Sequence, residues 1–98
     1  MLYQTEHWVS AYWEKHTGGS PRCYRLSLEQ DLWGSWCLRR QWQSLHNRQG
    51  RGMSQVCACR EDGLQALYQE ARRRARRQYK LMATVPEALR QVLQSEIP

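Results

Sequence analysis

Alternating apolar and polar residues predict three strands in the middle of the chain, over residues 22–29, 35–42 and 53–59. Gly34 lies in the first connection between them. Residues 44–52 form a polar, glycine-containing second connection. Segments joined by such turns pair as antiparallel neighbours. The pattern therefore predicts a small antiparallel sheet.

The spacing of apolar residues changes to a helical period after the third strand. It predicts a long helix from about Asp62, a candidate N-cap, to about Met82. One side of this helix is apolar and is expected to pack on the sheet, so its basic side should point away from the sheet. The apolar stripe consists of Leu64, Leu67, Tyr68, Ala71, Ala75 and Tyr79.

Two breaks divide the chain. Residues 17–21 combine two glycines with a proline, and Pro86 opens a last short helix. Residues 6–15, before the first break, fit either a short helix or a strand. We expect an N-terminal arm at 1–20, a core at 21–82 and a C-terminal short helix at 83–98, which makes the chain one domain of the α+β class.

The charge balance favours a polyanionic partner. The 98 residues carry a formal net charge of +6 with an isoelectric point near 9.6, which suits DNA, RNA or acidic lipid. Ribosomal or purely structural basicity is the alternative. No apolar run approaches the ~20 residues that span a membrane, and the first residues lack a signal pattern. A cytoplasmic protein with no membrane partner is expected.

The four cysteines do not predict a metal site. Cys57 and Cys59 form a C-x-C pair, which is not the usual zinc spacing, and cytosolic thiols stay reduced. The three histidines are scattered. No Ser-His-Asp set, paired carboxylates or phosphate-binding glycine loop can be assembled. We therefore expect no metal, no cofactor and no catalytic residues.

The order of several short motifs resembles that of the WGR domain family. Cys-Tyr-Arg-Leu-Ser-Leu-Glu occupies 23–29, Leu-Trp-Gly-Ser-Trp-Cys-Leu-Arg-Arg-Gln-Trp occupies 32–42, and Gly-Arg occupies 50–51, before the arginine-rich helix and Gln-Tyr at 78–79. The resemblance covers about residues 22–82. Trp42-Gln43-Ser44 stands where the family has Trp-Gly-Arg. The resemblance is to the small stand-alone bacterial members of the family.

The resemblance implies a compact antiparallel sheet backed by a long basic helix. It also implies DNA binding, since in poly(ADP-ribose) polymerases the domain binds beside a strand break and the motif tryptophan stacks on a terminal nucleotide. By position that role falls on Trp42. An ordinary core tryptophan is the alternative, because Trp36 and Leu38 share its strand face.

Two basic groups are candidate phosphate contacts. Arg39, Arg40, Arg48 and Arg51 lie close in sequence to Trp42, whereas Arg72, Arg73, Arg76 and Arg77 form a separate surface on the helix. The expected function is a non-catalytic nucleic-acid-binding module for DNA, with RNA as a weaker option. The alternative is a protein-interaction or inhibitor module that masks an acidic surface of a partner enzyme. Monomer and homodimer are equally expected.

Overall fold

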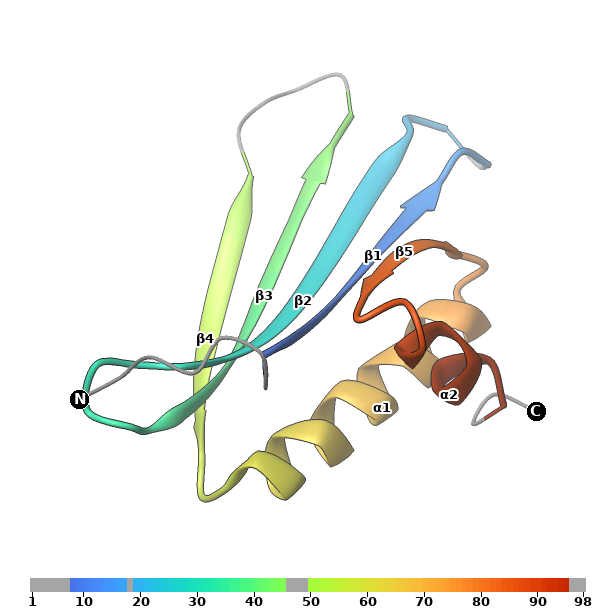
Figure 1. The fold of residues 1–98 in the computed structure, drawn as a ribbon. Coiled ribbons are helices and arrows are strands. Elements are labelled where there is room, and N and C mark those ends of the chain that lie inside the picture. Colours follow the sequence, from blue (N-terminus) through green and yellow to red (C-terminus); the bar gives the residue numbers. More distant parts are fainter. Residues whose placement is uncertain (1–7, 18, 46–49, 96–98) are drawn as a thin grey trace.

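The chain folds into a five-stranded antiparallel sheet with two helices, which is an α+β architecture (Figure 1). The computed structural model describes residues 8–17, 19–45 and 50–95. The strand order in the sheet is β4-β3-β2-β1-β5. The elements are β1 (Val9–Lys15), β2 (Arg22–Gln30), β3 (Trp36–Ser44), β4 (Arg51–Cys57), α1 (Arg60–Arg76), β5 (Lys80–Val85) and α2 (Leu89–Ser95).

The three strands expected from alternation are confirmed as β2, β3 and β4. Leu26, Leu28 and Leu38 are fully buried, and Leu28 pairs with Leu38 in register. Two further strands enlarge the sheet. The stretch that fitted either a helix or a strand forms β1, which pairs with both β2 and β5. The sheet therefore extends beyond the three expected strands.

The predicted end of the helix at Met82 is wrong. Helix α1 ends at Arg76, and Gln78 adopts a left-handed backbone with φ of 66°. Residues 80–85 then pair with β1 as β5. The reason is long-range: a free strand edge offers backbone hydrogen bonds that helical periodicity cannot reveal. At the other end, Cys59 is the N-cap and Asp62 lies inside the first turn, so Asp62 is not the cap.

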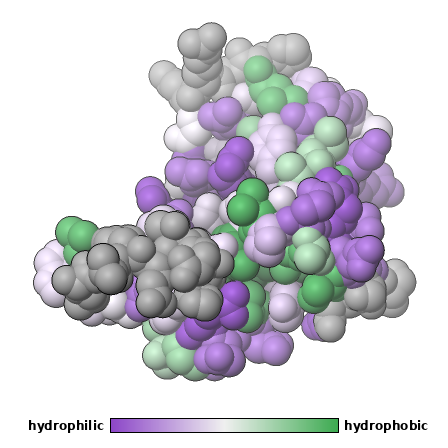
Figure 2. All heavy atoms as spheres, in the orientation of Figure 1, coloured by the Kyte–Doolittle hydropathy of each residue, from purple (hydrophilic) through white to green (hydrophobic). Residues whose placement is uncertain are grey.

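Both helices pack on one face of the sheet (Figure 1). Gly63 allows α1 to approach closely, because a Cβ there would collide with Cδ1 of Leu28. Leu67 from α1 and Leu89 and Leu93 from α2 complete the buried cluster. Figure 2 shows hydrophilic and hydrophobic residues interspersed over the surface seen in this orientation. No helix in the described part of the chain is long and apolar enough to cross a membrane.

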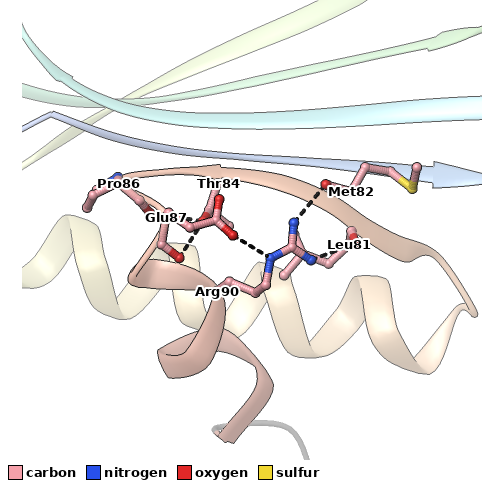
Figure 3. A network of polar contacts seen from close by, with 6 residues as sticks. All are labelled: Leu81, Met82, Thr84, Pro86, Glu87 and Arg90. Carbon is pink, nitrogen blue, oxygen red and sulfur yellow. Dashed lines mark hydrogen bonds and ion pairs between the residues drawn. The ribbon is translucent and has the colours of Figure 1, made fainter.

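The short C-terminal helix is confirmed as α2, and one arginine ties it to β5 (Figure 3). Arg90 donates hydrogen bonds to the backbone oxygens of Met82, at 2.8 Å, and Leu81, at 3.4 Å. Its Nε also donates to the Glu87 carboxylate at 3.2 Å. Carbonyl groups that lie near the sheet edge are thus bonded to a side chain of the same molecule.

Candidate functional site

A groove of about 710 Å³ opens between α1 and the end of the sheet where β2 begins and β3 ends. The described residues that line it include six arginines and one glutamate, which gives a formal net charge of +5. Three aromatic rings, Tyr24, Trp42 and Tyr79, also border it. We call it the arginine groove. Its arginines are Arg22, Arg40, Arg51, Arg73, Arg74 and Arg77.

Strand register brings the sheet's contribution together. Trp42 lies directly opposite Tyr24 on β2 and Arg51 on β4. Arg40 is two residues from Trp42, so it shares the face that looks toward α1. The half-buried Trp42 ring stacks on Tyr24, with centroids 6.1 Å apart and planes 13° apart. Trp42 therefore packs against the core and borders the groove at the same time.

Arg74 is a buried cation in this site. Its guanidinium lies 4.1 Å from the ring centroid of Tyr24 and 5.0 Å from that of Tyr79. The side chain lines the groove, and the residue is only 6% exposed. Its Nε is buried and has no hydrogen-bond partner among the described residues. Leaving a buried donor unsatisfied costs about 1–3 kcal/mol, so this arginine is held in place at a cost to stability.

Glu70 supplies the groove's one carboxylate and joins its two walls. One oxygen accepts a hydrogen bond from Arg73 at 3.0 Å and lies 3.9 Å from Nε of Arg40. The other accepts from the Tyr24 hydroxyl at 3.2 Å. Burial, followed by the negative charge of Glu70, raises the pKa of Tyr24 above its usual value. Glu70 therefore holds side chains from the sheet and from the helix in fixed positions.

The prediction that the helical arginines point away from the sheet is wrong for Arg73 and Arg77. Both line the groove together with Trp42. The reason is the orientation of α1, whose buried side includes Glu70 and Arg74 as well as apolar residues. Residues three or four apart share one side of a helix, so Arg73 and Arg77 flank this buried stripe. One basic surface therefore forms where two were expected.

The remaining predicted contacts do not line the groove. Arg39 points to the opposite face of β3, where it lies 3.7 Å from the Glu29 carboxylate. Arg72 and Arg76 are exposed on α1 and are not among the lining residues. Arg48 lies outside the described residues.

The charged and aromatic lining residues that were not predicted from the sequence are Arg22, Tyr24, Glu70, Arg74 and Tyr79. One signal was available in the sequence. Glu70 is the only acidic residue between positions 63 and 77, and arginines follow it at spacings of three and four. Such spacing favours ion pairs on one side of a helix.

No cluster of three or more histidine, cysteine or acidic residues within the described ranges is placed to hold a metal ion. All four cysteines are free thiols, and Cys23 and Cys57 are buried. In comparisons with known proteins, no protein-family model, curated protein or solved structure gives a significant match to the chain.

Proposed function

We propose that this protein is a non-catalytic nucleic-acid-binding module and that the arginine groove is its binding site, with DNA as the first ligand to test. The observation that carries the proposal is the gathering of a net charge of +5 and three aromatic rings in one groove. Nucleic acid supplies the matching pair of features, which are phosphate oxygens and flat rings.

Stacking and phosphate contacts are expected to contribute differently to the free energy of binding in the groove. Stacking of one base or sugar on Trp42 contributes about 1–3 kcal/mol, which orients a ligand but does not hold it alone. Contacts between arginine and phosphate supply the remaining affinity and make it sensitive to salt. The groove volume of about 710 Å³ suits a short stretch of nucleic acid rather than a whole duplex.

We also propose that the fold is WGR-like. Its support is the position of Trp42 near the end of β3, together with the order of three strands followed by the basic helix α1. The tryptophan borders the groove that the helical arginines also line. Gln43 and Ser44 replace the glycine and arginine of the family motif, so only the role of the tryptophan is proposed here.

A matched pair of substitutions tests the binding site. Arg77→Gln removes a charge that lines the groove, and Arg76→Gln removes a neighbouring charge on the same helix outside it. Fluorescence anisotropy with labelled duplex, nicked duplex, single-stranded DNA and RNA would measure the affinity of each variant. We expect Arg77→Gln to weaken binding at least threefold more than Arg76→Gln does. Equal losses of affinity in the two variants would contradict the proposal. So would a dissociation constant no tighter than ~10⁻⁴ M for each of the four nucleic acids.

A second candidate function is a protein-interaction or inhibitor module that masks an acidic surface of a partner enzyme. The observation that favours it is Trp33, which is 82% exposed at the tip of the β2–β3 hairpin. The tip is ordered, because Oδ1 of Asp31 accepts hydrogen bonds from the backbone of Trp33 and of Ser35. Tryptophan and arginine are the residues that most often dominate protein interfaces.

A pull-down followed by titration with the purified partner would test this second candidate. The combination Trp33→Ser with Arg76→Glu should abolish capture, whereas Arg77→Gln should retain it. Capture that survives the first change would rule the candidate out.

A further inference from the structure

The two edges of the sheet are built differently, and the β5 edge is blocked. The register between β1 and β5 shifts at Tyr12 and Trp13, which leaves Met82 as an extra residue in β5. The guanidinium of Arg90 donates hydrogen bonds to the backbone oxygens of Leu81 and Met82 in this strand (Figure 3). Pro86 follows the strand directly. Bulges, prolines and charged side chains are the usual devices that prevent an edge from pairing with another chain.

Between Gly52 and Cys57 the β4 edge has none of these devices. Its register with β3 runs without a shift from Arg51 to Cys57, and six of its seven residues are exposed. No proline and no charged residue occurs between Gly52 and Cys57. Met53 and Val56 are 61% and 72% exposed. A regular edge strand with exposed apolar side chains, charged only at one end, is a template for adding another strand.

We propose that β4 pairs antiparallel with β4 of a second copy of this chain, about a two-fold axis at Ser54. In this register all seven residues of β4 find a partner. Val56 of each copy lies opposite Gly52 of the other, so a branched side chain covers a residue that has no side chain. Met53 lies opposite Gln55, and Ser54 faces Ser54 across the axis.

The self-complementary register favours a second copy as the occupant, and the position of the charge on β4 does not oppose it. The charged residue of β4, Arg51, lies at one end of the strand. The two Arg51 side chains would be separated by about 20 Å along the strands, which exceeds the Debye length of about 8 Å at physiological salt. Because the β5 edge is blocked, pairing through β4 closes as a dimer rather than continuing into a filament. The axis is perpendicular to the sheet, so both arginine grooves lie on one face of the dimer.

The dimer is expected to be weak and to respond to salt in the opposite direction from nucleic-acid binding. A pair of seven-residue strands buries less than the roughly 1,200 Å² typical of stable interfaces. Each copy also carries a formal charge of +6, so screening by salt should strengthen the association. Binding of a polyanion weakens as salt rises. The two processes are therefore separable in one salt series.

Sedimentation equilibrium without nucleic acid, from about 10 μM to about 1 mM, would test the dimer. We expect the wild type to associate, Val56→Lys to be monomeric, and Val85→Lys on the blocked edge to associate like the wild type. Val56 and Val85 are both exposed, at 72% and 62%, so the two changes are matched. A monomer throughout the range, or equal association of the two variants, would overturn the proposal.

A cross-link provides a second readout that does not depend on how Val56→Lys folds. Ser54→Cys, in a background with Cys37→Ser and Cys59→Ser, should form a disulfide between the two copies on mild oxidation. Paired Cα atoms in antiparallel strands lie about 4.5–5.5 Å apart, which is within disulfide range. Peptide mapping should find the link at position 54. A yield no higher than that of an exposed control, Ser20→Cys, would contradict the register. Because no nucleic acid is present, failure here leaves the proposed function untouched.

Discussion

Replacing Glu70 with glutamine should lower the stability of the fold and raise the affinity of the arginine groove for anions. The side chain is 9% exposed, and its oxygens accept hydrogen bonds from Tyr24 and Arg73. A hydrogen bond to a charged group contributes about 1.5–3 kcal/mol. The pair with Arg73 is worth less, because the Arg73 side chain is 55% exposed. Since glutamine still offers Tyr24 an acceptor, we expect a loss of about 2 kcal/mol in the free energy of unfolding.

The effect of Glu70→Gln on binding should have the opposite sign. The groove would lose its one negative charge and change from a formal net charge of +5 to +6. At a separation of ~6 Å and an effective dielectric constant of ~40–80, one charge changes the interaction with a phosphate by about 0.7–1.4 kcal/mol. That corresponds to an affinity gain of roughly threefold to tenfold.

Urea denaturation and fluorescence anisotropy would measure the two effects of Glu70→Gln. The matched control is Glu87→Gln, which removes a carboxylate that pairs with Arg90 outside the groove and is 78% exposed. This control should change stability by less than about 0.5 kcal/mol, as expected for a surface pair, and should leave affinity nearly unchanged. A lower affinity of Glu70→Gln, or the same gain in affinity for both variants, would contradict this prediction.

Three further predictions address the packing around the groove. Trp42→Ala should weaken binding by about 1–3 kcal/mol because stacking is lost, and Trp42→Phe should weaken it less. Anisotropy titrations that are unchanged for both variants would show that Trp42 is not part of the binding site. Gly63→Ala should lower the free energy of unfolding by about 1 kcal/mol. Overpacking against Leu28 costs about 1–3 kcal/mol, which exceeds the gain in helix propensity of about 1 kcal/mol. A variant that is more stable than the wild type in urea denaturation would contradict this. The raised pKa of Tyr24 favours its neutral form in the folded state, so its contribution to stability is present below pH 10.0 and lost as pH rises above it. The difference in the free energy of unfolding between wild type and Tyr24→Phe should therefore shrink above that pH. A constant difference would argue against the burial effect.

Local pattern was enough to predict the middle of the sheet and the presence of both helices. Alternation works for β2 and β3 because one face of each strand is buried. It could not predict β5, since residues 80–82 continue the basic helical segment in sequence while their partner, β1, lies almost seventy residues away. Pairing between distant segments depends on tertiary contacts that a local pattern does not contain.

The candidate site was harder to predict than the fold. On a helical wheel Arg74 lies on the flank of the apolar stripe, and the charge of Glu70 and Arg74 gives no reason to expect either side chain to be buried. In the folded chain both are 6% exposed and turn toward the sheet, where Tyr24 and Tyr79 contact the Arg74 guanidinium. Burying a charge is costly unless partners satisfy it, and those partners come from other elements. The convergence of the arginines therefore could not be deduced from the helix alone.

The salt dependence of DNA affinity is the direct test of nucleic-acid binding in the arginine groove. If each of the five net positive charges in the groove meets one phosphate, the slope of log affinity against log salt is about −4.5 for duplex and about −3.5 for single-stranded DNA. Arg77→Gln should make the slope shallower by roughly 0.7–0.9, whereas Arg76→Gln should leave it unchanged. A slope near zero, or an equal change in both variants, would contradict the account of the arginine groove as a nucleic-acid-binding site.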